Sequence, residues 1–304
     1  MNIFVILIQL VYIVPSLILY LIIEVYLARR IWNKDPEFNT AFHTLFLLRA
    51  PVDIAQVLVS LVAFRFPMLR WEFVLSIPWL AKVGFILSHF CCLLELCSQL
   101  LLSANRLTAI TFPLSHNRWW TPQSTCTMFF FCFLLCLLPA GMRLPQQAEY
   151  VALEDKIVPR LLDPSDQQFN SVISCTVYSA FCIACLILNI ISIYVLSKQR
   201  REKLFDQQQA VTLRIQTNLL IYSCCFTLGI IAMTVFQCIL AIEKNPLTST
   251  WFPYVVLALS VAADIVALCN PWLLLFLSAP FRRQFLRKSS MALLFGADTS
   301  FTTN

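Results

Sequence analysis

Seven long apolar stretches limit the possible folds of this sequence more than any other feature. A helix needs about 20 apolar residues to cross a bilayer core of about 30 Å. The stretches that approach or exceed this length are residues 5–28, 41–64, 79–110, 124–141, 171–197, 211–242 and 252–278. The first lacks the basic start and the small-residue cleavage site of a signal peptide, so we expect it to remain as a helix. The sequence predicts an all-α membrane protein, a bundle of seven transmembrane helices in a single domain covering residues 1–304.

The composition agrees with a membrane protein. Hydrophobic residues make up 59% of the chain and charged residues only 12%, whereas soluble domains carry about 25% charged residues. Too little polar surface is present to cover a water-soluble globule. The net charge of +6 therefore bears on membrane orientation and anionic lipid headgroups, and we expect no nucleic-acid partner.

The basic residues divide unevenly between the two sides of the expected bundle. With the N-terminus outside, fourteen lie in inner segments: Arg29, Arg30, Lys34, Arg106, Arg118, Lys198, Arg200, Arg201, Lys203, Arg214, Arg282, Arg283, Arg287 and Lys288. Six lie in outer loops: Arg65, Arg70, Arg143, Lys156, Arg160 and Lys244. Because cytoplasmic loops carry an excess of Lys and Arg, we expect the N-terminus outside and the C-terminus in the cytoplasm.

Two short motifs stand in the third and seventh stretches. Asn105-Arg106-Leu107 precedes Phe112-Pro113-Leu114, where rhodopsin-like receptors have an acid, an arginine and a tyrosine before a proline-containing loop. Asn270-Pro271 resembles the start of their Asn-Pro-x-x-Tyr motif. Residues 279–285 predict a short amphipathic helix on the inner membrane face, at the start of a cytoplasmic tail that covers residues 279–304.

Together with Tyr12-x-x-Pro15-Ser16 and a very short N-terminus, these motifs resemble the nematode serpentine chemoreceptors over nearly the whole chain. Class V is the nearest class, with classes G and U as alternatives. The resemblance implies a G-protein-coupled receptor of sensory perception, in the plasma or ciliary membrane of sensory neurons, that signals to a heterotrimeric G protein. It implies switch or coupling roles for Asn105, Arg106, Asn270 and Pro271. For Arg106, an anchor to lipid phosphates is the alternative.

One departure from the rhodopsin-like pattern concerns the outer surface. Those receptors usually join the third span to the second outer loop by a disulfide, but residues 75–84 and 142–170 contain no cysteine. All 13 cysteines lie in apolar segments, where free thiols pack as small hydrophobes. We expect the outer loop to be held by packing or to be mobile.

Charged residues inside the spans predict a central polar cluster. Arg49 and Asp53 are four residues apart and share a helical face. Glu95, Asp264 and Asn270 lie at a similar depth, Glu95 about 16 Å and Asp53 about 18 Å from the inner ends of their helices. Three acids against one base require a protonated carboxyl or a cation, such as a sodium ion near Asp53. Three roles are open for the cluster: helix packing alone, a conformational switch, or ion binding.

Candidate ligand contacts lie in the outer half of the bundle. Lys82, Phe85 and His89 follow one face of the third span. Tyr178, Phe236, Gln237 and Tyr254 lie at comparable depths on the fifth, sixth and seventh spans. A single histidine on a helix is more often a packing residue than a ligand contact. The apolar lining favours a small extracellular molecule that is hydrophobic or amphipathic.

Two other classes of function compete with a receptor. The charged cluster favours a transporter or an ion channel, but the odd number of helices and the lack of internal repeats argue against both. An intramembrane enzyme needs paired carboxylates or a histidine-rich metal site. The three histidines, His43, His89 and His116, lie on separate segments, so we expect no enzyme and no metal cofactor.

Overall fold

Seven helices are long and apolar enough to cross a membrane, which confirms the predicted number of spans. The computed structural model describes residues 3–69, 72–153, 156–202, 207–242, 252–278 and 281–285. The seven helices are α1 (Ile3–Trp32), α2 (Ala41–Val59), α3 (Pro78–Thr111), α5 (Pro122–Gly141), α6 (Pro164–Glu202), α7 (Gln207–Ile242) and α8 (Phe252–Leu277). A short helix α4 (Pro113–Trp119) follows α3 where we expected a loop.

Local sequence explains where several helices begin. Pro78, Pro113 and Pro122 stand in the first turn of α3, α4 and α5, where the missing N–H would have no helical partner. Before α5, the Thr121 hydroxyl accepts a hydrogen bond from the Ser124 amide at 3.1 Å, and the Ser124 hydroxyl accepts one from the Thr121 amide at 3.0 Å. This reciprocal cap starts α5 two residues before the predicted span.

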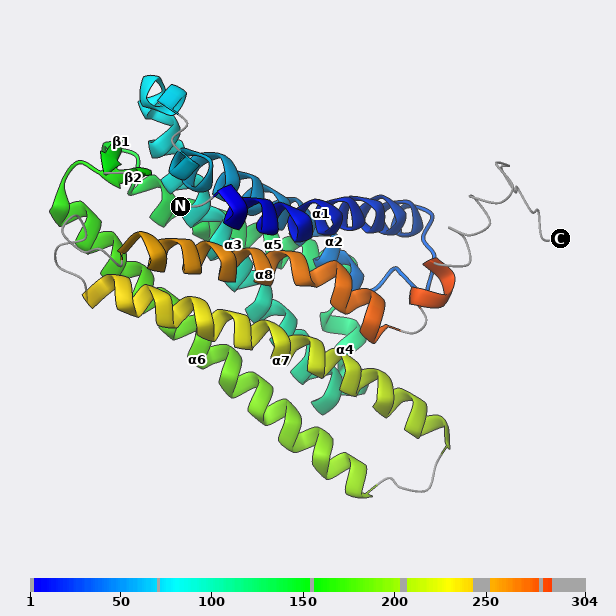
Figure 1. Ribbon diagram of the computed structural model, residues 1–304. Coiled ribbons are helices and arrows are strands. Elements are labelled where there is room, and N and C mark those ends of the chain that lie inside the picture. Colours follow the sequence, from blue (N-terminus) through cyan, green and yellow to red (C-terminus); the bar gives the residue numbers. More distant parts are fainter. Residues whose placement is uncertain are drawn as a thin grey trace, which may run out of the picture.

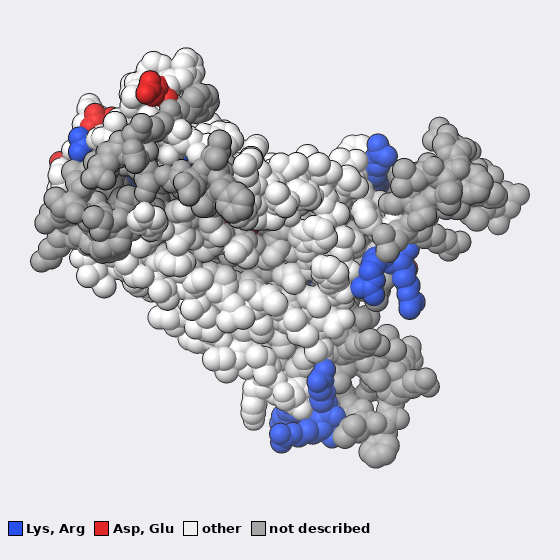
Figure 2. All heavy atoms as spheres, in the orientation of Figure 1, with Lys and Arg blue, Asp and Glu red and all other residues white. Residues whose placement is uncertain are grey.

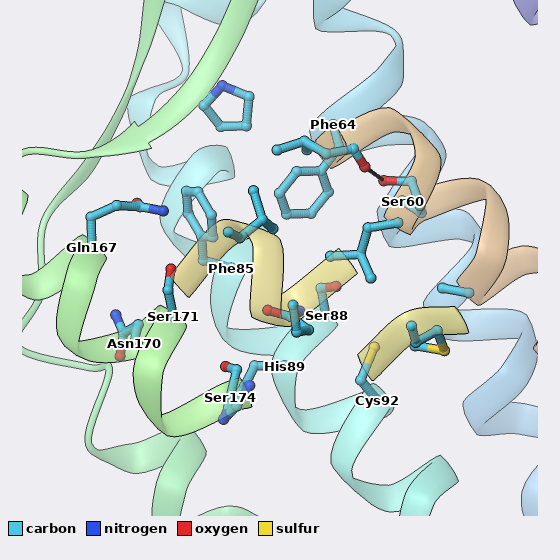
Figure 3. Close-up of a pocket in the computed structure, with 18 of the residues that line it drawn as sticks. Ser60, Phe64, Phe85, Ser88, His89, Cys92, Gln167, Asn170, Ser171 and Ser174 are labelled. Atoms are coloured by element: carbon cyan, nitrogen blue, oxygen red, sulfur yellow. Dashed lines mark hydrogen bonds between the residues drawn. The ribbon is translucent and has the colours of Figure 1, made fainter. Parts of the chain in front are cut away.

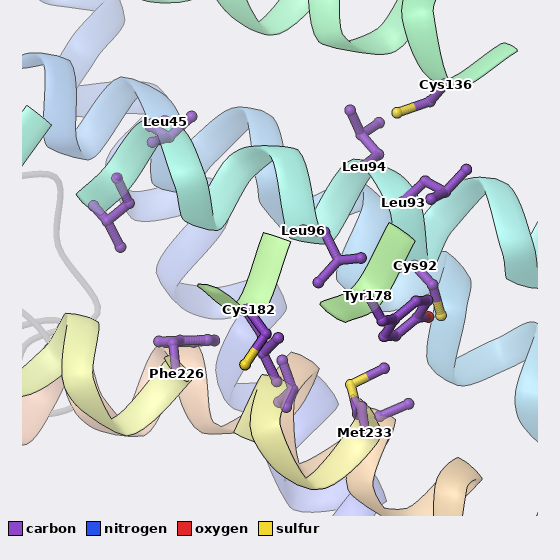
Figure 4. Packing of buried hydrophobic residues seen from close by; sticks show 14 of the residues in the cluster. Leu45, Cys92, Leu93, Leu94, Leu96, Cys136, Tyr178, Cys182, Phe226 and Met233 are labelled. Atoms are coloured by element: carbon purple, nitrogen blue, oxygen red, sulfur yellow. The ribbon is translucent and has the colours of Figure 1, made fainter. Parts of the chain in front are cut away.

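Helix α3 runs through the middle of the bundle and contacts α2, α5, α6 and α7 (Figure 1). Helix α1 packs on α2 and α8. The largest apolar cluster surrounds α3 and joins Leu94 and Leu96 to Tyr178 of α6 and to Phe226 and Met233 of α7 (Figure 4). The core therefore lies where α3 meets α6 and α7.

Charged residues segregate to the two ends of the bundle. Lys and Arg gather at one end, which we call the basic end, and the face between the ends is almost free of charge (Figure 2). Exposed basic residues at this end are Arg29, Lys34, Arg118, Lys198, Arg200, Arg201 and Arg283. Large apolar side chains point outward between the ends, such as Val11, Leu228 and Phe276. Such a surface suits a bilayer with water on both sides.

The opposite end carries a β-hairpin that we did not predict, and we call it the hairpin end. Strands β1 (Ala148–Leu153) and β2 (Lys156–Leu161) pair antiparallel, with Tyr150 opposite Pro159. Residues 154 and 155 lie outside the described residues. The hairpin occupies the loop that we expected to be held by packing or to be mobile.

Packing and one long-range hydrogen bond hold the hairpin. Tyr150, Ile157 and Leu161 are buried against Val74 and Ala81. The Tyr150 hydroxyl donates a hydrogen bond to the Ala63 carbonyl at 3.1 Å. All 13 cysteines are free thiols. Eleven of them are buried or partly buried, while Cys126 and Cys225 are exposed.

Helix α2 does not end at residue 64 as predicted. It continues as a π-helix, Ser60–Arg65, with a hydrogen bond from the Phe66 amide to the Leu61 carbonyl at 2.9 Å. The wider turn carries Arg65 into the bundle, where it is 0% exposed. The assignment of Arg65 to an outer loop was therefore wrong. Gly84 of α3 permits this close packing, because a Cβ there would lie 2.5 Å from the Ala63 Cβ.

The predicted amphipathic segment packs at the basic end. Residues 281–285 are helical, and Phe281 and Phe285 are buried against Tyr26 and Phe38. The Arg282 side chain donates to the Leu275 and Phe276 carbonyls at the end of α8. Residues 279–280 and the predicted tail from residue 286 onward lie outside the described residues, as do Arg70, Lys203 and Lys244.

Candidate ligand cavity and polar core

A cavity of about 160 Å³ lies inside the hairpin end. This volume would hold on the order of ten water molecules, so the cavity suits a small molecule. Strand β2 covers it through Val158, Pro159 and Leu161, and helices α2, α3, α6, α7 and α8 contribute its walls. Figure 3 shows the side chains of α3 and α6 facing one another across this space.

The cavity wall is amphipathic. One face of α6 contributes four polar residues to it: Gln167, Asn170, Ser171 and Ser174. Other polar residues in the wall are Gln56, Ser60, Ser88, His89, Arg143, Tyr178, Gln237 and Ser260. The apolar part includes Phe64, Met68, Phe85, Val158, Leu161, Met233, Leu240, Val256, Leu259 and Ala263. A molecule that fits both parts is itself amphipathic.

Four of the seven predicted ligand contacts line this cavity: Phe85, His89, Tyr178 and Gln237. Lys82, Phe236 and Tyr254 do not. Lys82 is one turn nearer the hairpin, where neighbouring Ala81 packs against it. Phe236 precedes Gln237 by one residue, about 100° around the helix, and does not face the same space. Tyr254 is 61% exposed on the outside of the bundle.

Sequence reasoning missed the α6 face because the predicted fifth span began at residue 171, whereas α6 begins at Pro164. A signal for this polar face was present in the spacing of its residues, because residues three, four and seven apart share one helical face. These residues are Gln167, Asn170, Ser171 and Ser174. Gln167 and Asn170 precede the predicted apolar stretch and therefore read as loop residues. The extra two turns bring them inside the hairpin end.

Arg143 is the other lining residue that we did not predict, because it was assigned to an outer loop. It follows α5 by two residues, and its guanidinium donates a hydrogen bond to the Ser174 hydroxyl at 3.2 Å. Burial lowers the pKa of Arg143 to about 10, which leaves it charged at neutral pH. No aspartate or glutamate of the described chain lines the cavity.

A buried polar core lies midway between the two ends, with Asp53 at its centre. Arg49 donates to Asp53 Oδ1 at 3.0 Å, and the Tyr20 hydroxyl donates to Oδ2 at 2.6 Å. The Asn270 amide also donates to Asp53, and the Tyr222 hydroxyl donates to the Asn270 oxygen. The network joins α1, α2, α7 and α8. It brings together three of the predicted residues, Arg49, Asp53 and Asn270.

Glu95 lies beside this core. Neither of its carboxylate oxygens has a hydrogen-bond partner within the described chain. Together with Arg49 and Gln99 it lines a small cavity of about 10 Å³, room for about one water molecule. No group of three or more His, Cys, Asp or Glu among the described residues could hold a metal ion. A sodium ion near Asp53 stays a prediction.

Asp264 belongs to a different network, so the expected single cluster is wrong in this part. Its carboxylate pairs with Arg65 at 2.5 Å, both side chains being 0% exposed, and it accepts a weak hydrogen bond from Tyr12 at 3.4 Å. Asp264 and Asn270 are six residues apart, about 9 Å along α8. Two bases, Arg49 and Arg65, thus pair with aspartates in these networks, beside the third acid Glu95.

We expect Tyr20→Phe to lower stability by about 1.5–3 kcal/mol, because it removes a hydrogen bond to a buried carboxylate. The measurement is the melting temperature of the purified chain in detergent. Tyr26→Phe on the same helix is the matched control. The Tyr26 hydroxyl accepts only partly exposed hydrogen bonds from Arg30 at 3.3 Å. Tyr26→Phe should therefore lower the melting temperature less than Tyr20→Phe. Equal melting of Tyr20→Phe and the parent chain contradicts the prediction.

Arg106 points into the bundle at the basic end. It is 7% exposed, and its guanidinium lies 4.5 Å from the centre of the Phe42 ring. Its Nε and Nη2 atoms have no hydrogen-bond partner in the described chain, nor has the buried amide nitrogen of Asn105. No described acid forms an ion pair with Arg106. This burial argues against an anchor to lipid phosphates.

Seven apolar helices, a cavity of small-molecule size at one end and a buried arginine at the other define a multi-pass membrane protein built like a receptor. A family model described as serpentine type 7TM GPCR chemoreceptor Srv matches residues 9–291. The chain belongs to this family of serpentine chemoreceptors. It is also 22% identical to Serpentine receptor class gamma-47 of Caenorhabditis elegans, over 85% of this chain and 84% of the relative. Since these matches fall in two classes, they do not separate class V from class G.

Proposed function

We propose that this chain is a chemosensory receptor that binds a small extracellular molecule in the cavity at the hairpin end and activates a heterotrimeric G protein at the basic end. The observation that carries the proposal is the placement of a covered, amphipathic cavity opposite the buried Arg106. Family membership supports the same assignment. The proposed location is the plasma membrane or the ciliary membrane of a sensory neuron.

The orientation in the membrane is part of this proposal. The exposed Lys and Arg residues of the described chain gather mainly at the basic end (Figure 2), and cytoplasmic segments carry such an excess. The hairpin end then faces outside, and the cavity is open to molecules from the surroundings. Helix α1 begins at the hairpin end and α8 ends at the basic end (Figure 1).

One face of α3 offers a physical route between the two ends. Residues spaced three or four apart follow this face from the cavity to the basic end: Phe85, His89, Cys92, Glu95, Gln99, Ser103 and Arg106. Gln99 and Ser103 contact Ser223 of α7 through hydrogen bonds of 3.1–3.3 Å. In our proposal, a ligand that shifts α7 against α3 changes these contacts and the surroundings of Arg106. The shift requires different ligand affinity for the two arrangements.

Substitution of Ser260 by tryptophan tests the cavity. Ser260 of α8 lines the cavity, so the indole should fill it and weaken ligand-evoked signalling by about tenfold or more. Ile265→Trp on the same helix is the control, because Ile265 is 56% exposed and its side chain points away from the core. Both variants are compared at equal surface expression. An unchanged response of Ser260→Trp rules out this cavity as the ligand site.

A second candidate function is a transporter or channel, which the buried charges of Arg49, Asp53 and Glu95 favour. One experiment distinguishes it from a receptor. Cells that express the chain with a G protein are exposed to a panel of odorants and pheromone-like molecules. A receptor gives ligand-evoked G-protein signals. Current or substrate flux that persists without G protein, with no G-protein signal, would establish the alternative.

A further inference from the structure

The cavity contains a positive charge that no acid among the described residues neutralises. Arg143 lines the wall, and its guanidinium donates a hydrogen bond to the hydroxyl of Ser174, which is neutral. No described acid pairs with it. Arg49 and Arg65, the other arginines in the interior near this level, are both paired with aspartates. Arg143 is partly buried, and a guanidinium withdrawn from water without a counter-charge is costly, so an anion in the cavity would be favoured.

The neighbours of Arg143 supply further groups suited to an anion. Ser171 and Ser174 are on the same face of α6, and His89 lies opposite on α3 (Figure 3). Hydroxyl and imidazole N–H groups donate hydrogen bonds to oxygen anions, and arginine binds carboxylates with two parallel hydrogen bonds. Among the described residues, the lining has no acid that would repel an anion. Charge and hydrogen bonding therefore favour a negatively charged group on this side of the cavity.

The rest of the cavity selects the body of the molecule. Met233 and Leu240 of α7 and Val256 and Leu259 of α8 line it, with Phe85 of α3. Apart from Gln237 and Ser260, this part offers apolar contacts, which favour an aliphatic or aromatic body. A fully polar anion such as phosphate would leave it unfilled. The volume of the cavity, on the order of ten water molecules, limits the apolar part of the ligand to a short chain or a single ring.

We propose that the cavity binds a small organic acid in its ionised form, with the carboxylate at Arg143 and Ser174 and the apolar body against α7 and α8. The assignment rests on the proposed function, because it names the class of ligand for that cavity. The assignment goes beyond the proposed function because it specifies a charged head group on the ligand and the residue that selects this head group. A neutral alcohol of the same length leaves Arg143 without its counter-charge.

Binding to the purified full-length chain in detergent tests this assignment. The probes are hexanoate, octanoate, decanoate and phenylacetate, each paired with the alcohol of the same skeleton, at concentrations below micelle formation. Affinity is taken from the shift of the melting temperature with concentration. We expect at least one acid to bind about tenfold or more tightly than its alcohol, as a hydrogen-bonded charge pair provides.

Variants assign that preference to a residue. Arg143→Gln should abolish the preference for acid over alcohol, and Arg143→Lys should retain part of it. Arg160→Gln removes the same charge from the hairpin, where Arg160 pairs with Glu149 on the surface, and should leave the preference intact. The proposal is overturned if no acid binds, if alcohols bind equally well, or if Arg143→Gln keeps the preference.

The failure of this assignment differs from the failure of the receptor proposal. If neutral odorants evoke G-protein signals that Arg143→Gln leaves unchanged, and no acid binds, the receptor stands and the acid site is wrong. If acids bind through Arg143 but no G protein responds to any of them or to any other compound of the panel, the acid site stands and the receptor proposal is wrong.

Discussion

Arg106→Ala is expected to disconnect the receptor from its G protein while the ligand still binds. The guanidinium is buried over Phe42, and two of its nitrogens have no described partner, so it is available for a new contact when the basic end rearranges. The loss of coupling should be about 5- to 150-fold, the usual range of coupling free energies. The measurement is ligand-evoked G-protein activation at equal surface expression.

Folding should survive this substitution. Arg106 has no described ion-pair partner, so its removal leaves no buried acid without its counter-charge, which is the costly outcome of breaking a buried pair. Arg118→Ala at the same end is the matched control, because Arg118 is exposed on α4, and its response should equal that of the parent chain. Full signalling by Arg106→Ala would contradict the assignment of Arg106 to coupling and would leave it a packing role.

The second large effect concerns stability. Arg65→Leu should destabilise the chain by about 3–5 kcal/mol, because it leaves Asp264 charged and unpaired in the interior. Both side chains of this pair are 0% exposed. We expect a strong loss of surface expression and a lower melting temperature in detergent.

The double variant Arg65→Leu/Asp264→Leu should recover most of that loss, since replacing a whole buried ion pair by apolar residues is often neutral or stabilising. Arg160→Leu is the control for loss of charge alone. Its pair with Glu149 is about one-third exposed, and exposed pairs contribute about 0–1 kcal/mol. If the double variant is as unstable as Arg65→Leu, the ion pair is not the reason for the instability.

The spans were predictable because length and hydropathy decide them in a bilayer. Each of the seven apolar stretches forms one helix, although several helices extend beyond the predicted limits. The pairing of Arg49 with Asp53 was also predictable, since both lie on one helix at a fixed spacing. Phe85 and His89 followed for the same reason, as α3 is regular through both positions.

What the sequence did not reveal depends on contacts between elements. The π-helix at Ser60–Arg65 is one extra residue in a turn, and apolarity does not mark it. Its effect is large, because it moves Arg65 from the surface to Asp264. The hairpin had a sequence signal in its β-branched and aromatic residues, but Pro159 argues against a central strand, and acidic residues between the strands read as an exposed loop.

The role of Arg143 in the cavity also could not be predicted from the sequence. Its position after an apolar stretch predicts a loop residue, and only the start of α6 at Pro164 brings Ser174 within hydrogen-bond distance of it. Sequence reasoning placed Phe85 and His89 of α3 on the face that lines the cavity, and their contact with a ligand stays a prediction. The same reasoning could not find the charge that selects the ligand, because that charge comes from a segment outside every helix.

The most direct test of the receptor is nucleotide exchange on a purified heterotrimeric G protein, catalysed by the full-length chain in lipid nanodiscs. The odorant and organic-acid panels are applied to the parent chain, Ser260→Trp and Arg106→Ala. We predict that at least one compound accelerates exchange by the parent chain, that Ser260→Trp loses both binding and exchange, and that Arg106→Ala loses exchange alone. No accelerated exchange with any compound or G protein, or equal exchange by all three chains, would contradict the account.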